Sequence, residues 1–479
     1  MPCPQMRSLQ DRHAGTVQRP STIISGMLGI ALGHHQAGRL IEAEQIYRQI
    51  LAIDAIQPDS LHLLGMIAYQ AGRLDAAVDM IRRAIAINNS QAAYHANMGT
   101  VLQAQGKLEE AVTCYERALA LQPDLAEVHT NLGNILQAQD KLHDAVASHE
   151  RALALRPQLA AAHYNLGLAQ LLKGDFTSGW RNLEWRWQTK DHETPMRPYP
   201  QPFWTGEKLP SGRLLIWGEQ GVGDEIMFAG LMPDAIRTGN RCMLDCDPRL
   251  QPLFARSFPG VDVVAGHASG NAAGNNLGLN PELDVAAHLP SGSLPNLFRP
   301  TTASFAATTS PYLVADPMER RRLRARYADG RRLIGLAWHT TSRKTGRERS
   351  IDLSLLAPLF AALDIRWISL QYGDPDALEN QVVAANAPIL IDRSVDQLSN
   401  IDLFAAQIAA MDMVITIDNS TAHLAGALGV PVWVLLPFAR DWRWLRARDD
   451  SPWYPTMRLF RQSQRGDWQS VVQRVQSAL

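Results

Sequence analysis

Small and apolar residues recur at a fixed interval through residues 22–191. One series of small residues is followed each time by a charged residue and then by Leu or Phe; its members are Gly38, Gly72, Gly106, Asp140 and Gly174. A second series has the same 34-residue spacing and comprises Gly65, Gly99, Gly133 and Gly167. With apolar residues at helical spacing around them, these series predict pairs of helices that pack closely where the side chains are small.

A 34-residue period is that of the tetratricopeptide repeat (TPR), so we expect an α superhelix of four full repeats and a fifth partial one. Pro123 and Pro157 fall at the turns between units. The segment Gly179–Trp187 is expected to be a closing helix that buries its tryptophans against the last repeat or the next domain. Residues 1–21 are expected to be a disordered N-terminus.

Asparagines recur inside the repeats with the same spacing, at Asn97, Asn131 and Asn165. On equivalent first-helix positions they would form a row along one face of the superhelix, where side-chain amides can bind the backbone of an extended peptide. Repeats of the O-linked N-acetylglucosamine transferases have a similar row, which implies a protein or peptide acceptor in the TPR groove. The alternative is that repeats copy residues regardless of function, as they copy His95, His129 and His163.

The pattern changes after the repeats. Residues 192–211 carry several prolines and read as a stiff linker. Short apolar runs then alternate with helical patterns such as Ile226–Ile236, which predicts two α/β halves, at residues 212–315 and 332–479. The predicted strands are Arg213–Trp217, Met243–Cys246, Val261–Val264, Asp284–Ala287, Arg332–Trp338, Arg366–Gln371, Ile389–Ile391, Val414–Ile417 and Val432–Leu436.

Charge and cysteine content narrow the class of protein. Lys and Arg total 46 against 47 Asp and Glu, so no global charge favours nucleic acid or an anionic membrane as a partner. The 4 cysteines are too few for a disulfide framework and lack zinc-site spacing. No apolar run reaches the length of a membrane span, and we expect a cytoplasmic protein without a transmembrane segment.

The strongest candidate for a ligand site follows the apolar run Met413–Ile417. The run stops at Asp418, small polar residues follow, and a short helical segment closes at Gly429 before the next apolar run. The loop Asn419–Thr421 offers side-chain caps, and we expect it to leave the first helical N–H groups free for an anion such as a nucleotide diphosphate.

Two further strand-to-helix turns have a composition that suits a ligand. The glycine-rich turn after Trp217 contains Gly221 and Gly223 and leads into Asp224. The turn after Trp338 has four basic residues within seven, which would suit a diphosphate leaving group; they are Arg343, Lys344, Arg347 and Arg349. The alternative for this second turn is an exposed basic loop without function.

The segment Asp418–Gly429 resembles the donor site of the heptosyltransferase-like (glycosyltransferase family 9-like) enzymes, with an Asp, small polar residues and His423 opening the helix beneath a sugar nucleotide. The similarity continues through Asp441-Trp-Arg-Trp444 and Ser451–Pro455 to Arg461-Gln462, a pattern of bacterial proteins that join TPRs to such a domain. The family pattern has a Lys or Arg-Ser pair where this chain has Arg349-Ser350. His339 stands where the family has a small residue, so this loop departs from the family pattern at that position.

This resemblance implies a GT-B fold of two Rossmann-like halves, the first on the acceptor side and the second on the donor side. It implies that Asp224 is the catalytic base and that no metal or other cofactor is needed. The residues expected to hold the nucleotide sugar are Gly221, Gly223, Lys344, Arg349, Ser350, Asp418, Asn419, Ser420, Thr421 and His423. Consistent with this, neither ligand loop contains Asp-x-Asp.

Two functions follow from these patterns. The first is an inverting, metal-independent glycosyltransferase that moves a sugar from a nucleotide-diphosphate sugar to an acceptor, a protein presented by the TPRs. The second is a catalytically inactive TPR scaffold for protein–protein interaction with a vestigial glycosyltransferase domain. Asp224 together with the segment Asp418–His423 favours the enzyme.

Overall fold

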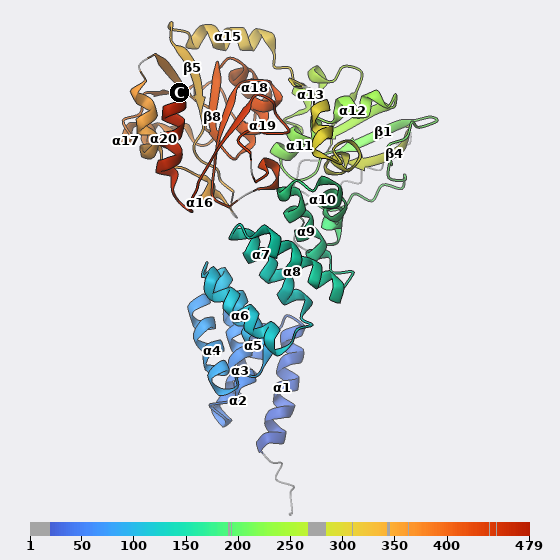
Figure 1. Ribbon diagram of the computed structural model, residues 1–479, viewed down its shortest axis with the longest axis vertical. Helices are drawn as coiled ribbons and strands as arrows, with labels where there is room; N and C mark the ends of the chain where they lie inside the picture. Colours follow the sequence, from blue (N-terminus) through green and yellow to red (C-terminus); the bar gives the residue numbers. More distant parts are fainter. Residues whose placement is uncertain are drawn as a thin grey trace, which may run out of the picture. The chain divides into compact units, whose positions relative to one another are not determined.

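The structure, a computed structural model, describes residues 20–479 except 190, 191, 193, 267–283, 309, 343, 344, 363, 440 and 447. The first 19 residues, which belong to the segment expected to be disordered, are thus outside the described part. The chain divides into two compact units, residues 1–135 with 154–157, and residues 136–153 with 158–479. Figure 1 labels many of the helices and several strands of the two units.

The first unit consists of paired antiparallel helices. They are α1 (Pro20–Gln36), α2 (Leu40–Ile53), α3 (Pro58–Gln70), α4 (Leu74–Ile87), α5 (Ala92–Ala104), α6 (Leu108–Leu121) and most of α7 (Ala126–Ala138). The predicted small residues lie where the two helices of a pair cross. A Cβ on Gly65 would lie 2.7 Å from Cγ1 of Ile81, and one on Gly99 would lie 2.7 Å from Cε1 of Tyr115. Larger side chains there would separate the helices.

The second unit begins with the end of the repeat array. It contains most of α8 (Leu142–Leu155), then α9 (Ala160–Lys173), α10 (Phe176–Leu183) and the 3-10 helix η1 (Glu184–Gln188). The expected closing helix is therefore α10 followed by one 3-10 turn. Trp180 in α10 is buried, and its ring contacts Trp442 edge-on with centroids 5.3 Å apart. The closing helix thus buries its tryptophan against the α/β part.

A four-stranded parallel sheet follows, with the strand order β3-β2-β1-β4. Its strands are β1 (Arg213–Trp217), β2 (Arg241–Cys246), β3 (Asp262–Ala265) and β4 (Val285–Pro290). The helices between and after them are α11 (Val222–Ala229), α12 (Met232–Arg237), α13 (Gln251–Ser257), η3 (Ser291–Ser293), α14 (Leu294–Phe298) and η4 (Thr302–Ala307). The single helix predicted for Ile226–Ile236 is two helices, because α11 ends at Ala229 and α12 starts at Met232.

A six-stranded parallel sheet makes up the rest of the unit, with the order β10-β9-β8-β5-β6-β7. Its strands are β5 (Arg332–Leu336), β6 (Ile365–Ser369), β7 (Ile389–Leu390), β8 (Met413–Ile417), β9 (Val432–Leu436) and β10 (Met457–Arg461). Its helices are α15 (Pro317–Tyr327), α16 (Gly346–Arg349), η5 (Leu353–Ala361), α17 (Pro375–Ala384), α18 (Ile401–Ala409), α19 (Ser420–Ala427), η6 (Trp442–Trp444) and α20 (Trp468–Ala478). The α/β character predicted for this part of the chain is confirmed.

Two features join the sheets within this unit. Helix α11 of the first sheet packs against α19 of the second, and the Tyr312 hydroxyl donates a hydrogen bond to the Ile226 carbonyl at 2.8 Å. The proline-rich stretch also lies against the first sheet, since Trp204 is buried and its backbone N–H donates to the His288 carbonyl at 2.9 Å. That stretch is therefore docked along β4 at this point and is more than a free spacer.

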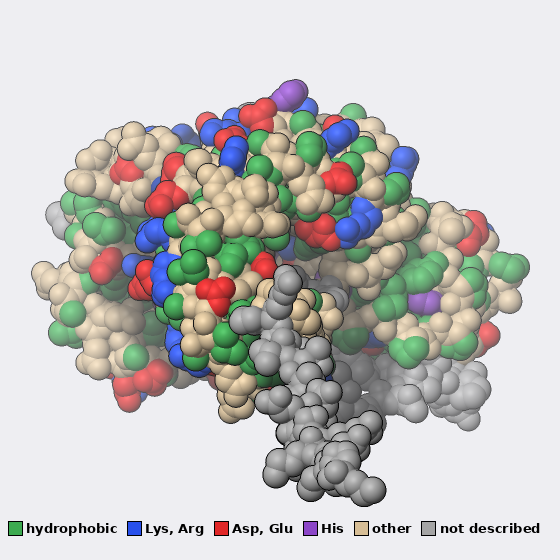
Figure 2. Space-filling view, turned by 90° about the horizontal axis from the view of Figure 1, so that it is seen from below, with side chains coloured by type: hydrophobic (Ala, Val, Ile, Leu, Met, Phe, Trp, Pro, Cys, Tyr) green, Lys and Arg blue, Asp and Glu red, His purple; other side chains and the backbone are tan. Residues whose placement is uncertain are grey.

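Surface charge is mixed in sign. On the face drawn in Figure 2, basic and acidic side chains are interspersed among apolar and neutral ones, as the near balance of 46 basic and 47 acidic residues leads one to expect. Of the helices that the structure describes, none has the length and apolar character needed to cross a bilayer.

Candidate functional site

Four segments that follow the carboxyl ends of parallel strands meet within the second unit. The segments after β1, β5, β8 and β9 carry Asp224 (in α11), Arg349 (in α16), Asp418 and Arg443 (in η6), respectively. In the larger sheet the chain moves in one direction from β5 to β6 and β7 and in the other from β8 to β9 and β10. The neighbouring strands β5 and β8 thus form a topological switch point, the place where open α/β sheets bind ligands.

Asn419 caps helix α19 with its own side chain. Its Oδ1 accepts hydrogen bonds from the N–H groups of Thr421 at 3.0 Å and Ala422 at 3.3 Å. The expectation that the first helical N–H groups stay free was therefore wrong for these two, because the capping carbonyl occupies them. The helix still begins at Ser420, directly after the end of β8.

His423 is buried one turn into α19. Its Nδ1 lies 3.0 Å from the Tyr454 hydroxyl, and its ring stacks on Trp444 with centroids 5.0 Å apart. Burial, helped by the positive charge of Arg443, lowers the pKa of His423 to about 4. The imidazole is consequently neutral at physiological pH, so it can orient a ligand but cannot supply a positive charge to a phosphate.

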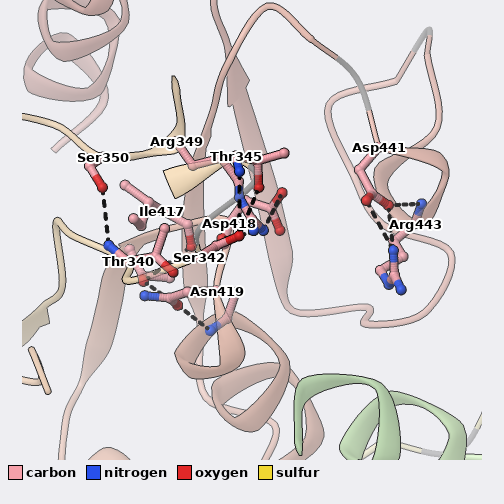
Figure 3. Close-up of polar contacts among 12 residues, drawn as sticks. Thr340, Ser342, Thr345, Arg349, Ser350, Ile417, Asp418, Asn419, Asp441 and Arg443 are labelled. Carbon is pink, nitrogen blue, oxygen red and sulfur yellow. Dashed lines mark hydrogen bonds and ion pairs between the residues drawn. The ribbon is translucent and has the colours of Figure 1, made fainter. Parts of the chain in front are cut away.

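Arg349 reaches the end of β8 from α16, as Figure 3 shows. Its Nη1 lies 3.2 Å from the Asp418 carbonyl and 3.4 Å from Oδ2 of the same residue. Ser350 is used within its own loop, where its Oγ accepts from the Thr340 N–H at 3.1 Å. Lys344 lies outside the described residues, so the basic loop contributes Arg349 to the site that can be described.

Three buried polar atoms at this switch point have no hydrogen-bond partner among the described residues. They are Nε of Arg349, Nδ2 of Asn419 and Oγ1 of Thr421. Asn419 is 7% exposed and Thr421 is fully buried. Because buried polar groups are nearly always hydrogen-bonded, three such atoms on adjacent loops indicate a place for a polar ligand. All three can donate a hydrogen bond, which suits a ligand rich in acceptors.

Asp224 forms an ion pair with Arg443. The Arg443 Nε donates to Oδ1 of Asp224 at 3.0 Å, and Nη2 donates to the same oxygen. Helix α11 begins at Val222 with Gly221 as its N-cap, so Asp224 lies in the first turn and does not cap the helix. Gly223 allows α11 to approach α19 closely, since a Cβ there would lie 3.3 Å from Cδ2 of His423.

The charged groups around this pair affect one another's pKa values. Burial, together with the nearby Asp441 carboxylate, raises the pKa of Asp418, and Arg349 opposes this effect. Burial alone would raise the pKa of Asp441 as well, but Arg443 outweighs it and lowers that pKa. Three acids, namely Asp224, Asp418 and Asp441, thus share two guanidinium groups, those of Arg349 and Arg443.

Sequence reasoning missed Arg443 and Gln220 as members of this cluster. Arg443 lies in the Asp441-Trp-Arg-Trp444 motif, and Gln220 precedes the Gly221 turn. The available signal was an acid–base pair among tryptophans directly after a buried strand. Nothing in the local pattern indicated that Arg443 pairs with a residue 219 positions earlier in the chain.

The in-phase asparagines contact neighbouring side chains. Nδ2 of Asn97 lies 2.7 Å from Nε2 of His62, and Asn131 hydrogen-bonds to the Tyr115 hydroxyl. The histidine series has a structural role, because His95 and His129 each contact a backbone carbonyl six residues earlier, at 3.1 Å. Asn165 belongs to the second unit. Whether the row binds peptide stays a prediction.

Comparisons with known proteins identify the first part of the chain. A family model described as TPR repeat matches residues 101–140 and 138–174, and one described as tetratricopeptide repeat matches residues 34–99. The chain therefore carries tetratricopeptide repeats, as predicted, followed by an α/β region.

Among curated proteins, Protein FlbA of Caulobacter vibrioides is 31% identical over 330 residues, which are 64% of this chain and 53% of FlbA. The chain thus spans about half the length of that relative. Because the repeat models end at residue 174, an alignment of this length extends into the α/β region.

Among solved structures, the chain is similar to PilF of Pseudomonas aeruginosa, with 16% identity, a TM-score of 0.36 and coverage of 46% of this chain and 87% of that one. YrrB, described as a TPR protein with an unusual peptide-binding site, has 19% identity, a TM-score of 0.30 and coverage of 35% and 90%. MamA from Desulfovibrio magneticus RS-1 has 17% identity, a TM-score of 0.30 and coverage of 36% and 93%.

Proposed function

We propose that this protein is an inverting, metal-independent glycosyltransferase of GT-B type that moves a sugar from a nucleotide-diphosphate sugar to an acceptor. The smaller sheet would form the acceptor side and the larger sheet the donor side. Two parallel sheets whose carboxyl-end loops meet are compatible with this fold. The acceptor would be a protein held by the TPRs, since the repeats are a protein-binding class of fold.

The observation that carries the proposal is the group of unpartnered donors at the end of β5 and β8. Nε of Arg349, Nδ2 of Asn419 and Oγ1 of Thr421 lack acceptors among the described residues. A diphosphate supplies several acceptor oxygens and negative charge, and guanidinium–phosphate hydrogen bonds are among the strongest in proteins. The N-terminal end of α19 adds its partial positive charge at the same place.

The proposed reaction is a single displacement. The oxygen of the acceptor hydroxyl forms a bond to the anomeric carbon while the bond from that carbon to the phosphate oxygen breaks. The hydroxyl proton passes to the Asp224 carboxylate, and the nucleoside diphosphate leaves with the electron pair of the broken bond. A base within hydrogen-bond reach contributes roughly 10²–10⁴ to the rate of such a step.

Calorimetry with UDP, GDP, ADP and CDP tests the donor site. Arg349→Ala should weaken the binding of the preferred nucleotide by roughly 1.5–3 kcal/mol, because it removes a charged hydrogen bond. The control is Arg320→Ala, which removes an exposed arginine of α15 and should leave the affinity unchanged.

A second pair of variants tests the helix terminus. Ser420→Pro should weaken binding, and Ser420→Ala should not if the backbone N–H matters most. Proline is tolerated as the first residue of a helix, and Asn419 already has the extended conformation that precedes proline, with φ −153° and ψ −179°. If Arg349→Ala and Ser420→Pro bound the nucleotide as tightly as the wild type, the nucleotide site would lie elsewhere.

A second candidate function is a TPR scaffold whose α/β domain has lost its chemistry. The ion pair between Asp224 and Arg443 favours it, because an acid already bonded to a guanidinium is not free to take a proton. The two functions differ in one measurement. An enzyme should slowly hydrolyse its nucleotide sugar even without an acceptor. A scaffold should bind a protein partner and hydrolyse no nucleotide sugar, and that outcome would end the enzyme proposal.

A further inference from the structure

Arg443 has no hydrogen-bond donor left for a ligand in the conformation described. A guanidinium has five N–H groups. Nε and one Nη2 hydrogen contact Asp224, the other Nη2 hydrogen points to Oε1 of Gln220 at 3.4 Å, and Nη1 contacts both carboxylate oxygens of Asp441 at 3.0 Å. Any new acceptor must therefore replace one of these partners.

The partner that holds Arg443 in its own loop is Asp441. Besides the two contacts of Nη1, Oδ1 of Asp441 accepts the backbone N–H of Arg443 at 2.8 Å. Asp224 comes from the other sheet and contacts only the tip of the side chain. The side chains of Arg443 and Asp224 are 16% and 18% exposed, so solvent reaches the pair. Asp224 is thus the partner that can be exchanged while Asp441 stays in place.

The pair lies beside the start of α19, where the nucleoside diphosphate is proposed to bind. A Cβ on Gly223, next to Asp224, would lie 3.6 Å from Cα of Ser420, the first residue of α19. Trp444, next to Arg443, stacks on His423 of the same helix. The positive charges of Arg443 and Arg349 both act on Asp418 and on His423. An anion at the start of α19 is therefore within the field of both guanidinium groups.

We infer that Arg443 is a further ligand-binding residue, which exchanges the Asp224 carboxylate for a phosphate oxygen when a nucleoside diphosphate binds at the start of α19. This inference rests on the proposed function. With three acids around two arginines, a diphosphate would add negative charge to a cluster that already lacks cations. When Arg443 turns toward the phosphate, it supplies the cation. The same movement frees Asp224 to take a proton from the acceptor hydroxyl.

The exchange predicts that Asp224 competes with the ligand. Asp224→Asn weakens the hold on Arg443 because a neutral amide replaces the carboxylate, so it should tighten UDP, GDP, ADP or CDP binding, whichever the wild type prefers, at least threefold. Arg443→Gln should weaken that binding about tenfold or more, the loss expected for a charged hydrogen bond to phosphate. Arg448→Ala removes an arginine of the same segment that pairs with Asp450, and it should change nothing.

Because Arg443→Gln leaves two acids without their cation and is at risk of misfolding, the double variant Asp224→Asn with Arg443→Gln completes the test. If Arg443 mediates the competition, the tightening caused by Asp224→Asn disappears in the double variant. If nucleotide affinity were lost in Arg349→Ala but equal in the wild type and Asp224→Asn, the exchange would be wrong and the donor-site proposal would still hold. No binding of any of the four nucleotides to the wild type would overturn both.

Discussion

Arg186 and Glu219 form a fully buried, two-pronged ion pair. Nε of Arg186 donates to Oε2 of Glu219 at 2.9 Å, and Nη2 donates to Oε1 at 2.8 Å. The pair connects η1, at the end of the repeat array, to the turn that follows β1. Arg186 also donates to Oγ of Ser293 at 2.9 Å, and Glu219 accepts the Gly292 N–H at 2.9 Å. Both partners therefore have their hydrogen-bonding groups largely paired, as a stable buried ion pair requires.

Breaking this pair should destabilise the second unit strongly. Arg186→Met leaves the Glu219 charge buried without its cation, and we expect a loss of about 3–5 kcal/mol in the free energy of unfolding. The double variant Arg186→Met with Glu219→Gln should lose clearly less, because the fully buried Glu219 charge is then absent and the amide oxygen that replaces the carboxylate can still accept the Gly292 N–H. Glu184, which also pairs with Arg186 at 3.1 Å, is partly exposed in both variants. Urea unfolding followed by tryptophan fluorescence measures both.

The matched control for this series is Arg181→Met, which changes an exposed arginine of α10 and should leave the unfolding midpoint in place. If Arg186→Met and Arg181→Met had the same midpoint, the ion pair would add nothing to stability. A double variant as unstable as the single one would show that geometry, rather than the unpaired charge, matters most.

Glu225 should make stability depend on pH. Burial raises the pKa of Glu225 to about 8, and the charges of Asp247 and Asp245 add to this. As pH rises from the unfolded-state pKa of roughly 4.3 to that value, the unfolded chain has lost this proton while the folded chain keeps it. The free energy of unfolding therefore falls through this range and levels off above about pH 8.

Glu225→Gln removes the titrating group and keeps an acceptor for the Asp247 N–H, which Glu225 holds at 2.9 Å. Between pH 6.5 and 8 the variant should gain roughly 1–2 kcal/mol relative to the wild type. The pKa values of the buried His62, His149 and His423 are lowered to about 4. Both proteins contain these histidines, so their contribution cancels in the difference between the wild type and the variant. Parallel curves for the two proteins would contradict this prediction.

The parts of the fold that sequence predicted are those set by local pattern. The repeat helices follow from a period that each unit carries within itself, and β1 and β9 follow from apolar runs with the same ends as the strands. Strand β10 was not predicted, because Met457–Arg461 is short and its apolar residues are interrupted by Arg458. The capping by Asn419 was foreseen, but its consequence for the N–H groups of α19 was not.

The site illustrates the same limit. Arg349 was expected near Asp418 because the family resemblance assigns both to the nucleotide-sugar site, and the structure brings them together. The pairing of Asp224 with Arg443 depends on how α11 packs against α19, which is a tertiary relationship between distant segments. Periodicity and motif spacing carry no information on such a pairing.

We expect Asn97 and Asn131 of the asparagine row to stabilise the first unit. Asn97→Ala leaves the buried His62 without its amide partner, and Asn131→Ala removes a bond to the Tyr115 hydroxyl. Each should cost about 0.5–1.5 kcal/mol of unfolding free energy in the full-length chain. The control is Gln105→Ala, whose bond to Asp75 is exposed and should matter little. Unchanged stability in both asparagine variants would leave peptide binding as the better account of the row.

Asp140 occupies the position where the other repeats have glycine, and it has the same left-handed backbone. Its φ is 64°, against 75° at Gly38, 72° at Gly72, 78° at Gly106 and 90° at Gly174. A side chain in this region costs about 1–2 kcal/mol. In return the Asp140 carboxylate contacts Arg446, with Oδ1 3.1 Å from Nε and Oδ2 3.1 Å from Nη2.

Replacing Asp140 separates these two effects. Asp140→Gly removes the backbone strain and a partly exposed ion pair worth about 0.2–1 kcal/mol, so stability should stay equal or rise slightly. Asp140→Ala keeps the strain and loses the pair, and it should be less stable than the wild type by about 1 kcal/mol. Arg446→Ala should fall between them. Thermal unfolding of the three variants gives their order of stability. A glycine variant less stable than the alanine variant would show that relief of the backbone strain does not dominate at position 140.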